Sequence, residues 1–118
     1  MYSTHEIANR LTELVSEQKF VEAYEQLYAD DAESIDLLDK EQSWLKGLTN
    51  LLEREKNLLS WTDINTINVS KPLVEGNTFA ISRSMNYTIM GQCQTEVEQL
   101  CIYQVKDGKI SRQQVFTN

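Results

Sequence analysis

The segment from residue 79 to residue 89 alternates between two kinds of side chain. Small or polar residues occupy every second position, and the positions between them carry large side chains: Phe79, Ile81, Arg83, Met85, Tyr87 and Ile89. Alternation with a period of two predicts a β-strand with one buried face. Arg83 lies within this otherwise apolar row, where a guanidinium needs a counter-charge or a ligand. The pattern therefore predicts a polar spot inside an apolar concavity.

The second half of the chain has the composition of a β-sheet. Asn, Thr, Val and Ile dominate from Trp61 onward. Gly91-Gln92 and Asp107-Gly108 are typical of hairpin turns. Consecutive hairpins predict an antiparallel meander of four strands, at residues 63–70, 78–90, 93–106 and 109–116.

The first half instead repeats its apolar residues at helical spacing. Ser3 and Glu6 have the spacing of a capping box, and the apolar residues after them recur at intervals of three and four: Ile7, Leu11, Leu14 and Val15. A second amphipathic helix is predicted at residues 20–27. These features indicate that helices precede the sheet.

The middle of the chain connects these two halves. We predict a short extended piece at residues 34–36, a loop at 37–43, and a third helix from Trp44 or Gly47 to Leu59. Helices followed by strands are typical of an α+β fold. We therefore expect one domain over residues 1–118, with three N-terminal helices packed on one face of a curved antiparallel sheet.

Composition limits the partners and cofactors of the chain. The net charge is −7 at pH 7 and the isoelectric point is near 4.6. Nucleic acids and anionic membranes are bound by clustered Lys and Arg, so we expect neither as a partner. Without a run of about 20 apolar residues, we expect a cytoplasmic protein. One His and two Cys, Cys93 and Cys101, predict no metal site and no cofactor.

Three segments carry a resemblance to a known family. They are LYADDA at residues 27–32, PLVEGNTFA at 72–80 and VKDGKI at 105–110. With the order of elements, they resemble the nuclear transport factor 2-like superfamily, and within it the SnoaL-like branch. The resemblance implies a cystatin-like cone, in which a bent sheet wraps three helices and leaves an apolar pocket at its wide end. It also implies a homodimer packed through the outer face of the sheet.

The resemblance points to one catalytic candidate. Asp36 falls where the ketosteroid isomerase branch keeps its general base, and apolar walls could raise its pKa toward neutrality. The two oxyanion donors of that branch fall near Thr12 and Cys101, which are poor replacements for acidic donors. The epoxide hydrolase and cyclase branches use further acidic residues that are missing here, with Met85 at one such position. We therefore expect a chain that does not follow these catalytic templates.

Asp36 and Arg83 are both expected on the pocket side of the sheet. They can form a partly buried ion pair with each other, or Arg83 can receive a carboxylate or phosphate group of a ligand. Both interpretations stay open at this stage. We predict that the pocket is lined by seven residues, namely Arg83, Met85, Tyr87, Gln99, Cys101, Tyr103 and Trp44.

Three functional hypotheses follow from these observations. The first is a homodimeric domain whose apolar pocket binds a small apolar or carbonyl-containing organic molecule. The second is an enzyme, an isomerase, lyase or polyketide-cyclase-like protein acting on a carbonyl compound with Asp36 as base. The third is a non-catalytic interaction module whose pocket is filled by its own side chains. The partner of Arg83 and the volume around it separate these hypotheses.

Overall fold

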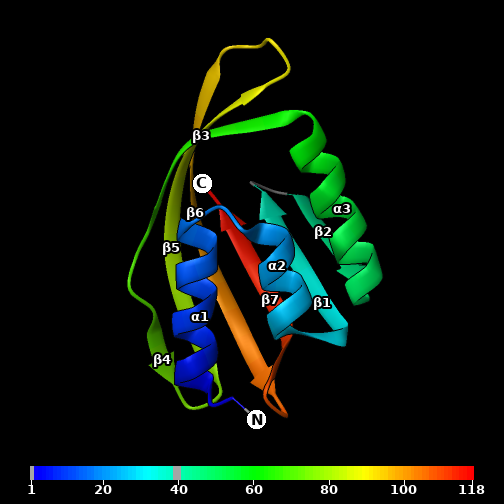
Figure 1. Ribbon diagram of the computed structural model, residues 1–118, viewed down its shortest axis with the longest axis vertical. Coiled ribbons are helices and arrows are strands. Elements are labelled where there is room, and N and C mark those ends of the chain that lie inside the picture. The colour runs from blue at the N-terminus through cyan, green and yellow to red at the C-terminus, as the bar shows by residue number, and fades with distance from the viewer. Residues whose placement is uncertain (1, 39–40) are drawn as a thin grey trace.

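Three helices cover one face of a curved, unclosed sheet in the computed structural model, which describes residues 2–38 and 41–118 (Figure 1). The helices are α1 (Thr4–Ser16), α2 (Phe20–Leu27) and α3 (Leu48–Ser60). The strands are β1 (Tyr28–Leu38), β2 (Glu41–Lys46), β3 (Thr62–Val69), β4 (Leu73–Glu75), β5 (Thr78–Ile89), β6 (Gln94–Lys106) and β7 (Lys109–Thr117). Within the described residues the strand order is β2-β1-β7-β6-β5-β3, and β4 also pairs with β5. The predicted α+β class, with three helices on a curved sheet, is confirmed.

The sheet is mixed rather than wholly antiparallel. The predicted four-strand meander is present: β3, β5, β6 and β7 lie side by side in that order, and each neighbouring pair is antiparallel. However, β1 lies beside β7 and runs parallel to it. β1 follows α2 directly, and its parallel neighbour β7 is the last strand of the chain. A parallel pair needs a long connection of this kind, so turn signals between neighbouring strands cannot reveal it.

The segment predicted as a loop at residues 37–43 belongs largely to an antiparallel hairpin. β1 continues to Leu38 and β2 begins at Glu41, while residues 39–40 lie outside the described residues. The period-two signal of β1 is weak because its inward positions include Ala32 and Ser34, which are small. The short piece expected at residues 34–36 is the middle of this long strand.

Two of the described helices, α1 and α3, begin at local signals in the sequence. The Ser3 side chain accepts a hydrogen bond from the backbone N–H of Glu6 at 3.1 Å, and the Glu6 carboxylate accepts one from the Ser3 N–H at 3.0 Å, which confirms the capping box. Gly47 precedes α3 with φ of 100°, a conformation that favours glycine. Trp44 lies in β2, so the longer form of the third helix is wrong. None of the described helices is long and apolar enough to cross a membrane.

The core fills one end of the space between the helices and the concave face. α1 and α2 contribute Ile7, Leu11, Leu14 and Leu27, and the sheet contributes Phe79, Ile81, Tyr103 and Ile110. The rings of Phe79 and Tyr103 stack with their centroids 4.7 Å apart. Burying each large side chain contributes about 1.5–3 kcal/mol to folding. The inward row of β5 starts in this core and then leaves it beyond Ile81.

Candidate functional site

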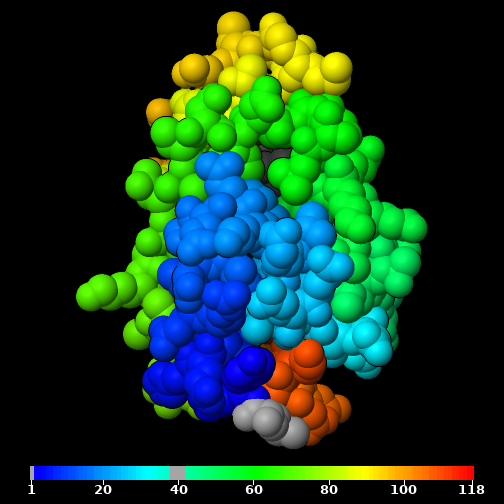
Figure 2. All heavy atoms as spheres, in the orientation of Figure 1, coloured from blue at the N-terminus to red at the C-terminus, as the bar shows by residue number. Residues whose placement is uncertain are grey.

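A cavity of about 430 Å³ lies between the helices and the concave face of the sheet. Residues at the start of α2, the end of α3 and the start of β3 line it, and Figure 2 shows a hollow between these segments. The apolar part of its wall comes from α3, β3, β5 and β6: Leu58, Leu59, Ile64, Met85, Ile89 and Val97, with Trp61 beside them. The polar part is a compact set: Tyr24, Asp36, Arg54, Glu55, Arg83, Gln99 and Gln113. An apolar wall with a few convergent polar groups is typical of a small-molecule site.

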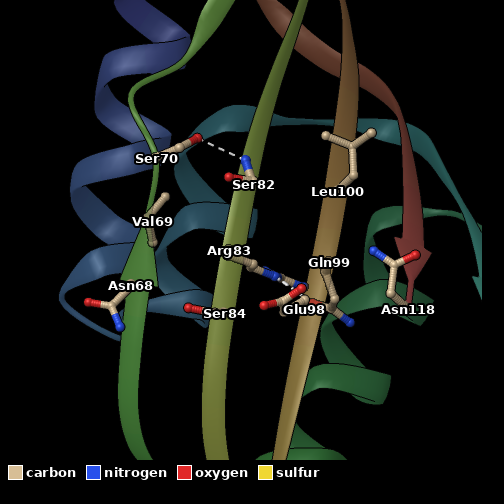
Figure 3. A pocket seen from close by; sticks show the side chains of 10 residues that line it. All are labelled: Asn68, Val69, Ser70, Ser82, Arg83, Ser84, Glu98, Gln99, Leu100 and Asn118. Atoms are coloured by element: carbon tan, nitrogen blue, oxygen red, sulfur yellow. Dashed lines mark hydrogen bonds between the residues drawn. The ribbon is translucent and has the colours of Figure 1, made fainter.

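Arg83 extends from β5 toward the helices, so that its side chain passes behind the strands in Figure 3. Its Nε donates a hydrogen bond to Oε1 of Gln99 at 2.6 Å, and Gln99 is its direct partner in the pairing of β5 with β6. Nε2 of Gln99 donates in turn to Oγ1 of Thr117 at 3.0 Å, which fixes the orientation of the amide. Among the described residues, no carboxylate lies within ion-pair distance of Arg83 and its terminal nitrogens have no hydrogen-bond acceptor. Its terminal N–H donors are therefore available within the cavity.

Asp36 forms its ion pair with Arg54 rather than with Arg83. Nη1 of Arg54 lies 2.7 Å from Oδ2 of Asp36, and the Ser34 hydroxyl donates to the same oxygen at 3.2 Å. Nη2 of Arg54 also donates to Oγ of Ser34 at 3.2 Å. Of the two interpretations, the ion pair between Asp36 and Arg83 is therefore not formed, because α3 packs over β1 and Arg54 on α3 is the partner of Asp36. Asp36 lines the cavity with its charge already compensated.

Glu55 follows Arg54 on α3 and also lines the cavity. In the described part of the chain its carboxylate has no hydrogen-bond or ion-pair partner. Burial raises the pKa of Glu55 above its ordinary value, although Arg83 and Arg54 act in the opposite direction. Glu55 is thus a partly buried carboxyl group of the site with no partner among the described residues.

A buried hydrogen-bond network supports the polar side of the cavity. The Tyr28 hydroxyl donates to Oε1 of Gln113, and Nε2 of Gln113 donates to the Tyr24 hydroxyl at 3.1 Å and to Oγ of Ser34 at 2.9 Å. Because Tyr24 accepts this bond, its own proton remains free to donate. Burial raises the pKa of Tyr24, which keeps that proton on the hydroxyl at neutral pH.

The structure brings together some of the residues predicted to line the pocket and separates others. Arg83, Met85, Tyr87 and Gln99 line the cavity, as does Asp36. Cys101 and Tyr103 lie on the same face but are buried in the adjoining core. Contact between these residues and a ligand stays a prediction.

Trp44 lies away from the cavity, contrary to our expectation. It is opposite Ile35 in the pairing of β1 with β2, and it faces outward because the neighbouring Ser34 and Asp36 face inward. Its Nε1 donates to Oε2 of Glu33 at 2.9 Å, and the residue is 58% exposed. The sequence predicts Trp44 at or just before the start of a helix. In the structure it lies in β2, and its side chain is on the outer face of the sheet.

Sequence reasoning missed Arg54, Glu55, Tyr24 and Gln113. A signal for Glu55 exists, because it occupies the position between Leu52 and Leu59 on the apolar stripe of α3. A charged residue at such a position is as informative as Arg83 within its apolar row. Gln113 has no comparable signal, since its neighbours Arg112 and Gln114 are equally polar. No group of His, Cys, Asp and Glu among the described residues is arranged to hold a metal ion.

Comparison with known proteins places this architecture in a family. The SnoaL-like domain family matches the chain over residues 2–117. No curated protein sequence matches the chain significantly. A solved structure of a proposed SnoaL-like polyketide cyclase from Mesorhizobium loti is 23% identical, with a TM-score of 0.89 over 97% of this chain and 98% of that chain.

Two other solved structures show the same fold at lower similarity. A phenazine biosynthesis-related protein from Pseudomonas aeruginosa is 18% identical, with a TM-score of 0.73 over 98% of this chain and 81% of that one. An LEH-like epoxide hydrolase from M. tuberculosis is 10% identical, with a TM-score of 0.73 over 98% and 82%. At these identities the likeness concerns the fold and not the activity. Because the family match spans nearly the whole sequence, this chain belongs to the SnoaL-like domain family of the nuclear transport factor 2-like superfamily.

Proposed function

We propose that the chain binds a small organic anion, such as a carboxylate, in the interior cavity, with Arg83 as the group that receives the negative charge. One observation carries this proposal: Arg83 reaches into the cavity with only its Nε engaged by another described residue. A guanidinium with its terminal donors free matches the geometry of a carboxylate, which it can bind through two parallel hydrogen bonds.

The surroundings of Arg83 support an organic rather than an inorganic ligand. Apolar side chains such as Ile64 and Met85 form much of the cavity wall, and removing a ligand's apolar surface from water contributes about 25 cal/mol per Å². The volume of about 430 Å³ falls within the range of typical ligand sites. The same volume favours a ligand site over an interaction module whose pocket is filled by its own side chains.

The arrangement around Asp36 argues against its use as a general base. Its Oδ2 accepts hydrogen bonds from Arg54 at 2.7 Å and from Ser34 at 3.2 Å. These bonds occupy the Asp36 oxygen with donors of the protein itself, so that it is not directed at a substrate. Binding at Arg83 is therefore the better-supported function, and an enzyme that relies on Asp36 is the weaker alternative.

Calorimetric titration with a small panel of carboxylates tests the proposal. Benzoate, phenylacetate and octanoate are suitable probes, with benzyl alcohol as the neutral comparison. We expect saturable binding of at least one carboxylate, and we expect Arg83→Met to weaken it by about tenfold or more, the range expected for a charge-assisted hydrogen bond. Arg10→Met, at an exposed position on α1, is the matched control and retains binding. Equal affinity in wild type and Arg83→Met, or no binding of any carboxylate, contradicts the proposal.

We further propose that two copies associate through the outer face of the sheet. The strand pairing aligns one outward row across the sheet, made of Trp44, Ile35, Gln114, Ile102 and Ala80. The adjacent row contains Leu37, Phe116 and Leu100, and Leu100 is 42% exposed. Leu100 also lines a groove of about 500 Å³ on this face, drawn in Figure 3. Apolar side chains aligned in this way suit a two-fold contact between identical faces.

A further inference from the structure

We propose that Glu55 is the proton-transferring group of the cavity, whose carboxylate removes a proton from a carbon atom of a ligand while negative charge develops on a ligand atom near Arg83 and Tyr24. The proposal deepens the proposed function and rests on it, because it requires a ligand in the cavity. It assigns the chemistry to α3 rather than to Asp36 on β1.

The position of Glu55 distinguishes it from the other carboxylates of α3. It interrupts the apolar stripe of the helix and lines the cavity, whereas Glu53, two residues earlier, is exposed to solvent. In the part of the chain that the structure describes, no donor satisfies the Glu55 carboxylate. Glu55 is partly buried, and a carboxylate that opens onto a largely apolar cavity without a protein partner is a candidate functional group.

The charged groups around Glu55 come from three elements. Arg83 on β5, Arg54 on α3 and Asp36 on β1 line the same cavity and interact with Glu55 electrostatically. The titratable hydroxyl of Tyr24 on α2 also lies in this cavity and interacts with Glu55. The two arginines favour the ionised form, whereas burial and Asp36 favour the protonated form and raise the pKa overall. A carboxylate with a raised pKa is a stronger base once it is ionised, which suits it to proton abstraction.

Two donors of the same cavity can stabilise the charge that the ligand acquires. Arg83 keeps its terminal N–H donors free, and the Tyr24 hydroxyl accepts from Gln113 and retains its own proton for a ligand. In the step proposed, the C–H bond breaks, the proton joins the Glu55 carboxylate, and the electron pair moves through the ligand to an electronegative atom near these donors. Return of the proton to the ligand restores the carboxylate.

The Kemp elimination of 5-nitrobenzisoxazole provides a direct probe of such a base. A carboxylate removes the proton from C3, the C≡N bond forms, the N–O bond breaks, and the charge appears on a phenolate oxygen. The product, 2-cyano-4-nitrophenolate, is followed by its absorbance. We expect each protein molecule to act at least about 10²-fold faster than acetate at the same concentration and pH, as positioned general bases do. The rate should rise with pH as Glu55 ionises.

Matched variants identify the group responsible. Glu55→Gln should reduce the rate by about 10²-fold, to the level of acetate. Glu53→Gln removes an exposed carboxylate from the same helix and should leave the rate unchanged. An NMR titration of the Glu55 carboxyl carbon provides a second measurement on the unmodified protein, and a pKa at or below 4.5 would contradict the proposal independently of any variant.

Binding of the product separates this inference from the proposed function. We expect 2-cyano-4-nitrophenolate to bind to wild type and to bind more weakly to Arg83→Met. If the phenolate binds in this way but Glu55→Gln and wild type react equally fast, the role of Glu55 is wrong and the anion site stands. If wild type neither binds the phenolate nor exceeds acetate, both proposals are wrong.

Discussion

Arg83 on β5 and Gln99 on β6 are paired residues, and a hydrogen bond of 2.6 Å joins Nε of Arg83 to Oε1 of Gln99. This bond leaves the two terminal nitrogens of the guanidinium free. Gln99 is itself held by Thr117 on β7, so three strands determine where the guanidinium lies. This arrangement prepares Arg83 for a ligand without a counter-charge at ion-pair distance among the described residues. The contributions of Arg83 to the free energy of unfolding and to ligand binding can be measured separately.

Replacing Arg83 with Met should have little effect on stability. The substitution removes the hydrogen bond to Gln99 but also removes a desolvated charge, and Asp36 keeps its partner Arg54. We expect the free energy of unfolding to change by less than about 1.5 kcal/mol, measured by urea denaturation. A loss above about 3 kcal/mol would show that Arg83 neutralises a buried carboxylate.

Replacing Arg54 with Met should be more harmful than replacing Arg83. The change leaves Asp36 facing the cavity with only Ser34 as a donor. We expect a loss of about 2 kcal/mol in the free energy of unfolding, the scale of a hydrogen bond to a charged group. Asp36→Asn in the same background should recover part of the loss. Equal stability of the Arg54→Met and Arg83→Met proteins would contradict this account of the ion pair.

The two tyrosines bonded to Gln113 should differ in importance for folding. Tyr28→Phe removes the donor to Oε1 of a buried amide, whereas Tyr24→Phe leaves Nε2 of Gln113 bonded to Ser34. We expect Tyr28→Phe to cost about 1–3 kcal/mol and Tyr24→Phe less than about 1 kcal/mol in thermal or urea unfolding. Tyr24→Phe should instead weaken the binding of carboxylate probes. The reverse order of stabilities would contradict this account of the hydrogen bonds to Gln113.

The pKa of Glu55 should appear in the pH dependence of stability. Because the folded pKa is raised above the ordinary value of 4.5, the folded protein holds a proton that the unfolded chain has released. The free energy of unfolding should therefore fall as pH rises from 4.5 through the folded pKa. Urea denaturation over a pH series should show this fall in wild type and in Glu53→Gln but not in Glu55→Gln. Parallel pH profiles for all three proteins would contradict it.

Association through the outer sheet face predicts sensitivity to charge at Leu100. We expect sedimentation at micromolar concentration to show a dimer for wild type and a monomer for Leu100→Glu, because a buried like-charge pair would form across the two-fold axis. Leu58→Glu alters an exposed leucine beside the cavity rather than on the outer face and should leave the dimer intact. A monomeric wild-type protein under these conditions would refute the proposed association.

The sequence predicts the strands of the long hairpins better than it predicts the site. Alternation along β5 assigns Arg83 to the inward face because each residue of a strand points opposite to its neighbour. The partner of Asp36 depends instead on the rotation of α3 about its axis where it packs over β1. The spacing of apolar residues along α3 does not determine this rotation closely enough to identify Arg54 as the partner. Trp44 shows the same limit, since the β1–β2 hairpin carries few large apolar residues on its inward side. The parallel pairing of β1 with β7 joins the two ends of the fold and has no local signal.

A crystal structure with 4-bromobenzoate tests the central claim most directly, because the anomalous signal of bromine locates the ligand without ambiguity. We predict that the carboxylate lies against the terminal nitrogens of Arg83 and that the bromine points toward the apolar wall that contains Leu58 and Trp61. Bromine found only outside the cavity, with Arg83 still contacting Gln99 alone, would contradict the account.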